Sequence, residues 1–147
     1  MKRFKKLVVG MLIGFVAFGV FDLSQPTPKA AAYSGCKSSE LPNVTLGATD
    51  LDICVSESGS NVNVSMKIFN NSTTSYPYYE WTMYLQRYTN GAWSNVGSRT
   101  GYISGDSSSN RTFTNVADKN TKMRVKAVFS YEGGGSVGTR YSNTWTR

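Results

Sequence analysis

Residues 78–99, YYEWTMYLQRYTNGAWSNVGSR, decide the fold because they predict two β-strands joined by a tight turn. In the first half of the stretch, apolar side chains occupy every second position, which is the period of a strand with one buried face. These side chains are Trp81, Met83 and Leu85. The dipeptide Asn90-Gly91 tolerates the two positive φ angles of a type I′ turn. Trp93 and Val96 follow in a return strand, so the stretch predicts a β-hairpin.

The N-terminal part of the chain has the layout of a secretory signal peptide. A basic MKRFKK opening is followed by the apolar run 7–21 and by a Pro-containing segment that ends in alanines at 30–32. This layout predicts a signal helix, residues 1–32, that is cleaved after Ala32. A retained membrane anchor is the alternative, but the run is shorter than the ~20 residues that span a bilayer. We therefore expect a secreted, extracellular protein with no stable membrane insertion.

Cleavage also changes the charge of the protein. The full chain has 16 Lys and Arg against 9 Asp and Glu, a net charge of +7. Five of the basic residues and one acidic residue belong to the leader, so residues 33–147 keep 11 against 8 and a net charge of +3. This mild excess favours contact with anionic envelope polymers, but it is too small to predict nucleic-acid binding.

The exported part has the length of one domain and the composition of strands and turns, rich in Thr, Ser, Val, Tyr and Gly. We expect an all-β fold over residues 33–147. The predicted strands cover residues 50–56, 62–69, 79–88 with its return strand, 111–116, 122–131 and 137–145. Residues 33–49 are expected to form an irregular N-terminal arm or an edge strand. Residues 100–110 are expected to form a loop, with a short strand at 102–103 as an alternative.

Cys36 and Cys54 are the two cysteines of the chain, and both lie in the exported part. An even pair in an oxidising compartment predicts a Cys36–Cys54 disulfide that holds the N-terminal arm against the first strand. The alternative is acylation of Cys36, since residues 33–36 loosely resemble a lipoprotein processing box. That box normally has Leu at the position of Tyr33 and follows the apolar run directly, which favours the disulfide.

The chain resembles a known family from the hairpin onward. The residues Leu85-Gln86-Arg87, Trp93, Val96, Phe113 and the run 123–127 (MRVKA) are similar to the signature of immunoglobulin-like and fibronectin type III-like modules in small secreted bacterial proteins, Gram-positive and Bacillus-like. The resemblance covers residues 62–145. It implies one antiparallel β-sandwich of about seven strands, with strand F beside strand C, and a binding or structural role.

The sequence departs from this family at two places. Both cysteines precede Trp81, so the bridge between strands B and F of antibody domains cannot form. Thr121 stands where the tyrosine of the fibronectin corner is expected. These departures leave the fold class in place and the subfamily open.

The sequence contains few of the residue types that enzymes use for catalysis. The chain has no histidine, which removes the usual general base and the usual zinc ligand. Asp50, Asp52 and Glu57 are candidates for a weak calcium site, although solvated strand residues are the simpler interpretation. We expect a non-enzymatic protein with no catalytic residue, no cofactor and no metal.

One strand face carries the candidate binding surface. If Trp81, Met83 and Leu85 point inward, the alternate side chains, three of them tyrosines, point outward. The resemblance places strand F beside strand C, which implies that the basic side chains of residues 122–131 lie next to these tyrosines. The candidate residues are Tyr78, Tyr84, Tyr88, Lys122, Arg124 and Lys126. Tyrosine rings suit sugars or protein surfaces and the cations suit phosphate-bearing polymers, although ordinary solvated strand residues explain the same pattern.

Two classes of function remain from the sequence. The first is a binding or structural module at the cell envelope or in the extracellular matrix, with an anionic cell-wall polymer, a carbohydrate or a protein as partner. The alternative is a bacteriocin-like or membrane-active antagonist, which the export signal, small size and positive charge also allow. The exported part has no basic amphipathic helix and no long apolar segment, which favours the binding module.

Overall fold

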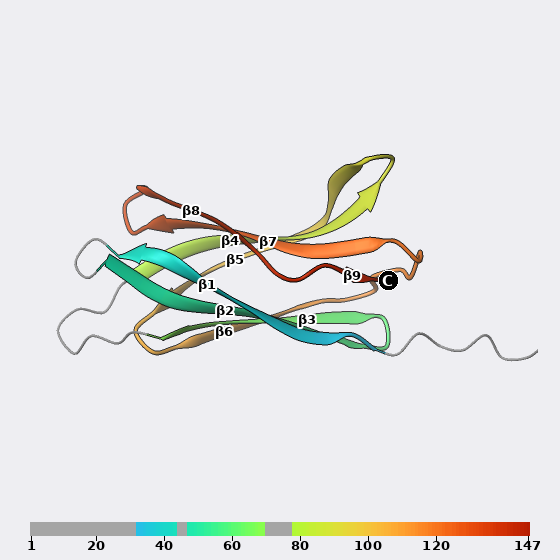
Figure 1. The fold of residues 1–147 in the computed structure, drawn as a ribbon, viewed down its shortest axis with the longest axis horizontal. Coiled ribbons are helices and arrows are strands. Elements are labelled where there is room, and N and C mark those ends of the chain that lie inside the picture. Colours follow the sequence, from blue (N-terminus) through green and yellow to red (C-terminus); the bar gives the residue numbers. More distant parts are fainter. Residues whose placement is uncertain (1–31, 44–46, 70–77) are drawn as a thin grey trace, which may run out of the picture.

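A computed structural model of the chain describes residues 32–43, 47–69 and 78–147 (Figure 1). The described residues form nine β-strands and no helix. The strands are β1 (Ser34–Asn43), β2 (Gly47–Ser58), β3 (Asn61–Phe69), β4 (Tyr78–Thr89), β5 (Ala92–Ser104), β6 (Ser108–Phe113), β7 (Lys122–Tyr131), β8 (Ser136–Tyr141) and β9 (Trp145–Thr146). The predicted signal helix, apart from Ala32, lies outside the described residues.

The strands build two antiparallel sheets that lie face to face (Figure 1). One sheet has the order β1-β2-β3-β6, and the other has the order β5-β4-β7-β8 with β9 paired to β7. The all-β, sandwich-like prediction is therefore confirmed. The strands number nine where about seven were expected, because the N-terminal segment and the end of the chain each form an additional strand.

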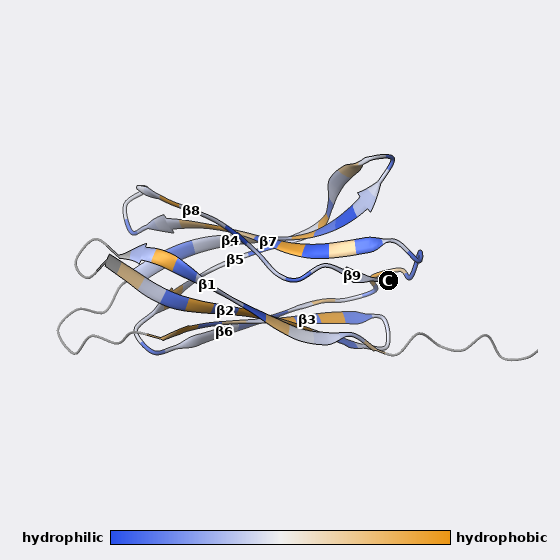
Figure 2. Ribbon diagram, viewed as in Figure 1, coloured by the Kyte–Doolittle hydropathy of each residue, from blue (hydrophilic) through white to orange (hydrophobic). Residues whose placement is uncertain are grey.

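The core lies between the two sheets and follows the alternation of the sequence. Every inward side chain predicted for β3, β4 and β7 is buried, and Figure 2 shows apolar and polar residues alternating along β7. These side chains are Val62, Val64, Met66, Ile68, Trp81, Met83, Leu85, Met123, Val125, Ala127 and Phe129. Because successive side chains of a strand point to opposite faces, this burial also determines which side chains point away from the core.

The β4–β5 hairpin has the predicted turn, with φ of 54° at Asn90 and 80° at Gly91. Its return strand differs from the prediction in one respect. The register shifts between Leu85 and Gln86, so that Val96 is an extra residue in β5 and is 50% exposed. Such a bulge bends and twists the strand. Val96 is therefore not a core residue.

The loop predicted for residues 100–110 is mostly wrong. β5 continues to Ser104, and β6 already begins at Ser108. A Cβ at Gly101 would come within 2.5 Å of the Trp81 ring, and one at Gly97 within 3.0 Å of the Phe113 ring. The glycines in β5 therefore provide room for neighbouring rings and do not mark a loop.

The N-terminal segment is an edge strand, not an irregular arm. β1 pairs with β2 over its whole length, and Leu41 is fully buried. The hydroxyl groups of Tyr79 and Tyr131, from the other sheet, both donate to the Pro42 carbonyl, at 3.0 and 3.1 Å. Its backbone ladder and these two donors hold β1 in place, which the few apolar side chains of this segment did not suggest.

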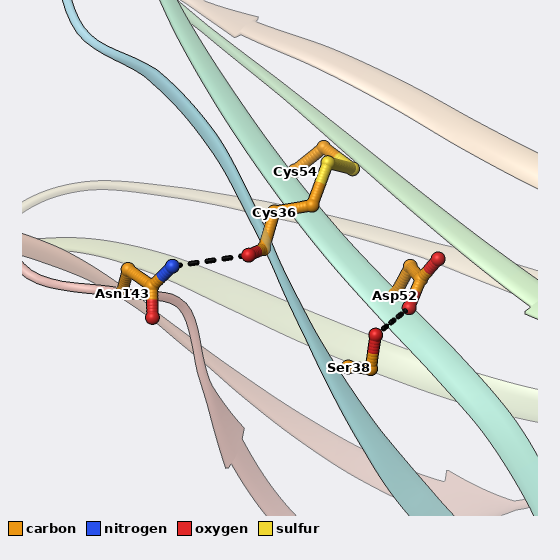
Figure 3. Close-up of a disulfide and its surroundings, with 5 residues drawn as sticks. All are labelled: Cys36, Ser38, Asp52, Cys54 and Asn143. Atoms are coloured by element: carbon orange, nitrogen blue, oxygen red, sulfur yellow. Dashed lines mark hydrogen bonds between the residues drawn. A yellow bond between two sulfur atoms is a disulfide. The ribbon is translucent and has the colours of Figure 1, made fainter.

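Cys36 and Cys54 form the predicted disulfide (Figure 3). The two residues lie directly opposite each other in the β1–β2 register, with their Cα atoms 3.9 Å apart. The Asn143 amide, from the connection between β8 and β9, donates to the Cys36 carbonyl at 3.0 Å. The bridge therefore reinforces an edge strand that backbone hydrogen bonds already hold.

Glu57, near the end of β2, is the acceptor at the centre of a second group of contacts. Its side chain is 8% exposed and accepts from Arg147 Nη1 at 2.8 Å and from Trp145 Nε1 at 3.0 Å. The Tyr33 backbone N–H donates to its other oxygen at 3.1 Å. Burial raises the pKa of Glu57. The hydrogen bonds and the charge of Arg147 lower this pKa by more than burial raises it, so it lies below the ordinary value of 4.5.

Replacing both cysteines, Cys36→Ser with Cys54→Ser, should lower the free energy of unfolding by up to about 3 kcal/mol and leave a folded protein. The bridge restricts the unfolded chain, whereas the core residues from Val62 onward pack without it. Urea unfolding followed by circular dichroism measures the loss, and the wild-type protein under reducing conditions is the matched control. A double variant without a cooperative transition would contradict this account of the core.

Replacing Glu57 by Gln should lower the free energy of unfolding by about 3 kcal/mol at pH 7, because the variant leaves the buried Arg147 guanidinium without its charge partner. The folded pKa of Glu57 is lowered, so its contribution is complete above the ordinary value of 4.5 and is lost as the pH falls through the folded pKa. The stability difference between wild type and variant should therefore shrink below pH 4.5. Unfolding curves at pH 7 and pH 3 check this, and a constant difference would contradict it.

Candidate functional site

The candidate surface is the outward face of the sheet that contains β4 and β7. These strands are direct neighbours, with Tyr84 opposite Lys126 and Gln86 opposite Arg124. Lys126 therefore lies beside Tyr84, and Arg124 beside Gln86, so β7 is the neighbour of β4 that the resemblance implied. Lys126 Nζ lies 5.9 Å from the centre of the Tyr84 ring.

Arg124 is the best-anchored cation on this face. Its Nε donates to Gln86 Oε1 at 2.9 Å, and Gln86 Nε2 donates to Asn95 Oδ1 at 2.9 Å, so one row of hydrogen bonds crosses β7, β4 and β5. The guanidinium carbon lies 4.1 Å from the Trp93 ring centre and 4.3 Å from that of Tyr141. Two rings and an amide therefore hold the charged group in one orientation.

The hairpin end of the face is raised by the bulge. Beyond Leu85 and Gln86 the hairpin bends, and Figure 1 shows its tip turned away from the other sheet. Tyr88 and Trp93 are paired across the hairpin with their ring centres 5.2 Å apart, and Tyr88 is 39% exposed. The two rings thus form a raised edge beside Arg124.

We name this region the basic-aromatic end. It consists of Tyr84, Tyr88, Trp93, Lys122, Arg124, Lys126 and Tyr141. Two of these residues were missing from the sequence prediction. The turn at Asn90-Gly91 already placed Trp93 opposite Tyr88, so the register of the hairpin contained that signal. No sequence signal indicated Tyr141, because its position opposite Lys126 depends on how β8 pairs with β7.

Tyr78 is the one residue of the predicted binding surface that does not belong to the basic-aromatic end. It is six residues before Tyr84 on β4, which corresponds to about 20 Å along an extended strand. Its ring stacks on that of Tyr102 with the centres 5.5 Å apart. Desolvation, together with the carboxylates of Glu132 and Glu80, raises the pKa of Tyr78. Tyr78 therefore belongs to an acidic end of the same face.

The candidate calcium ligands do not come together. Glu57 is occupied by Arg147 and Trp145, whereas Asp52, five residues away on β2, accepts from Ser38 Oγ at 2.5 Å (Figure 3). Among residues 32–43, 47–69 and 78–147 no group of three or more His, Cys, Asp or Glu is arranged to hold a metal ion. The grouping of Asp50, Asp52 and Glu57 in the sequence reflects one strand and not one site.

No family model, curated protein or solved structure matches this chain. The strands and surfaces described above are therefore the basis for a functional assignment. In the part of the chain that the structure describes, no helix has the length and apolar character needed to cross a bilayer.

Proposed function

We propose that this chain is a secreted, non-enzymatic module that binds an anionic polymer of the cell envelope through its basic-aromatic end. The observation that carries the proposal is the anchoring of Arg124 between the Trp93 and Tyr141 rings. An arginine held in a fixed plane recognises phosphate or carboxylate groups with little loss of side-chain entropy. The adjacent rings provide flat apolar surface for the sugar or polyol units between the charges.

The distribution of acidic residues supports the same function. Residues 81–105 and 119–131, which include the basic-aromatic end of β4, β5 and β7, contain no Asp or Glu. The cations Lys122, Arg124 and Lys126 therefore have no acidic neighbour on their own strands. Adjacent positive charges without local compensation attract a polyanion and favour fast association.

We also propose that the chain is exported and that it belongs to the immunoglobulin-like or fibronectin type III-like sandwiches. β4 is flanked by β5 and β7, and β7 by β8, which agrees with strands C′, C, F and G of an immunoglobulin-like or fibronectin type III-like sandwich. β2, β3 and β6 then correspond to strands A, B and E, and β1 is an addition at the edge. The Cys36–Cys54 disulfide indicates an oxidising environment, in agreement with the predicted leader.

Co-sedimentation of the mature protein with purified cell walls tests the function. We expect binding at low salt that weakens as salt is raised, because screening reduces attraction between exposed charges. The double variant Lys122→Gln with Lys126→Gln should bind at least fivefold more weakly. Its control is Lys37→Gln with Lys67→Gln, which removes the same charge from exposed positions on the other sheet.

Three results would overturn the proposal. They are no binding at low salt, an equal loss of binding in the control variant, and binding that does not respond to salt. Growth inhibition of related bacteria by the mature protein, without wall binding, would replace it with the antagonist function.

A further inference from the structure

We propose a second site, a phosphate-binding pocket on the inner side of the bent β4–β5 hairpin. A hollow of about 390 Å³ lies between this hairpin and the connection from β6 to β7. Its charged lining residues are Arg87, Arg99 and Lys119, and no acidic residue lines it. The pocket lies behind the hairpin, away from the basic-aromatic end, so the inference goes beyond the proposed function.

Arg87 is the main argument for a ligand. The residue is 5% exposed, and one of its Nη atoms donates to the Ala117 carbonyl and contacts Met123 Sδ at 3.7 Å. Its Nε is buried and has no hydrogen-bond partner among the described residues. The one ion pair within residues 32–43, 47–69 and 78–147 joins Arg147 to Glu57, so Arg87 has no carboxylate partner there. A buried guanidinium without a counter-charge is costly, and a bound anion would offset that cost.

Arg99 is placed as the second ligand. It donates to the backbone carbonyls of Ser98 at 2.8 Å and Thr112 at 3.0 Å, and its guanidinium carbon lies 4.9 Å from the Phe113 ring centre. These contacts hold the cation beside the hollow. The guanidinium groups of Arg87 and Arg99 and the ammonium group of the exposed Lys119 carry three positive charges, whereas a carboxylate ligand would carry one negative charge. They suit a dianionic phosphate, free or as a monoester.

The bulge in the hairpin creates the space for this ligand. The hollow is lined by Val96 and Gly97, the residues of β5 at the register shift. A Cβ at Gly97 would come within 3.0 Å of the Phe113 ring, so a side chain there would crowd the pocket wall. The same bend therefore raises the basic-aromatic end on one side and opens the pocket on the other.

Thermal unfolding and titration calorimetry test the pocket, with inorganic phosphate and glycerol 3-phosphate as separate probes and sodium chloride at equal ionic strength as the reference. We expect millimolar phosphate to raise the melting temperature by several degrees. In Arg99→Gln with Lys119→Gln this rise should fall at least fivefold, whereas Lys37→Gln with Lys67→Gln should retain it. These variants leave the buried Arg87 in place, so folding is preserved.

Three outcomes would overturn the pocket. One is no excess effect of either phosphate probe over chloride, and another is an equal loss in Arg99→Gln with Lys119→Gln and in Lys37→Gln with Lys67→Gln. Loss confined to Lys122→Gln with Lys126→Gln would likewise reject it, since the phosphate would then occupy the basic-aromatic end. Binding of glycerol 3-phosphate but not inorganic phosphate would support the pocket and identify an ester as its ligand.

A different observation carries a second inference, on the processing of the N-terminus. The backbone nitrogen of Tyr33, the residue after the predicted cleavage site, lies 3.1 Å from Glu57 Oε2. The Tyr33 carbonyl accepts from the Glu57 N–H at 2.9 Å, and the Tyr33 ring stacks on Trp145 with the centres 5.4 Å apart. Backbone and ring therefore both hold this nitrogen at the buried carboxylate.

We infer that leader removal after Ala32 completes an ion-pair cluster at Glu57. Hydrolysis of the Ala32–Tyr33 peptide bond consumes one water and leaves a carboxylate on Ala32 and an ammonium group on Tyr33. The neutral N–H that now donates to Glu57 becomes a charged donor beside Arg147. Charge-assisted hydrogen bonds are roughly twice as strong as neutral ones. The mature protein should thus be more stable than any form extended by even one residue.

A double-mutant cycle tests this inference. Protein that begins at Tyr33 is compared with protein that begins at Ala32, in the wild type and in Glu57→Gln, at pH 6 where the α-amino group is charged. The extension should lower the melting temperature by about 4 °C in the wild type and by less than about 1 °C in the variant. An equal change in both backgrounds, or no change in either, would overturn it. The inference would also be overturned if the intact mass of the secreted protein showed that its first residue is not Tyr33.

Discussion

The burial of one face of β4 is the constraint on which the rest of the structure depends. Trp81, Met83 and Leu85 are buried between the two sheets, and the period of the strand then directs Tyr84 away from the core. Because β4 is paired on both sides, the same alternation is imposed on β5 and β7 through their registers. The core and the candidate binding face are therefore two consequences of one pattern.

The bulge after Leu85 interrupts this pattern at the point where the hairpin leaves the sandwich. On the outer side it brings the Trp93 ring over Arg124. On the inner side Arg87 remains buried, but it faces a hollow and not a packed core. One extra residue in β5 thus accompanies two cationic environments of different character, a flat outer face and a hollow on the inner side of the hairpin.

The opposite sheet shows how an edge with few apolar side chains is kept in place. β1 is held by its ladder with β2, by the disulfide and by tyrosine hydroxyl groups that reach Pro42 from the other sheet. At the other end of β2, Glu57 joins Tyr33 to Trp145 and Arg147. Directional polar contacts compensate for the limited hydrophobic burial at this edge.

The sequence by itself determined the features that depend on local periodicity and turn chemistry. These are the β4–β5 hairpin and the alternation of buried and outward side chains along the strands. The Cys36–Cys54 pair followed from the presence of only two cysteines, and the neighbourhood of Tyr84 and Lys126 was implied by the resemblance to immunoglobulin-like modules. Only the tertiary structure decided that the glycines of β5 lie in a strand, that Tyr141 joins Arg124, and that Arg87 and Glu57 are buried with such different partners. The physical reason is that a period identifies the two faces of a strand, whereas its contacts depend on residues distant in sequence that the packing of the sheets brings together.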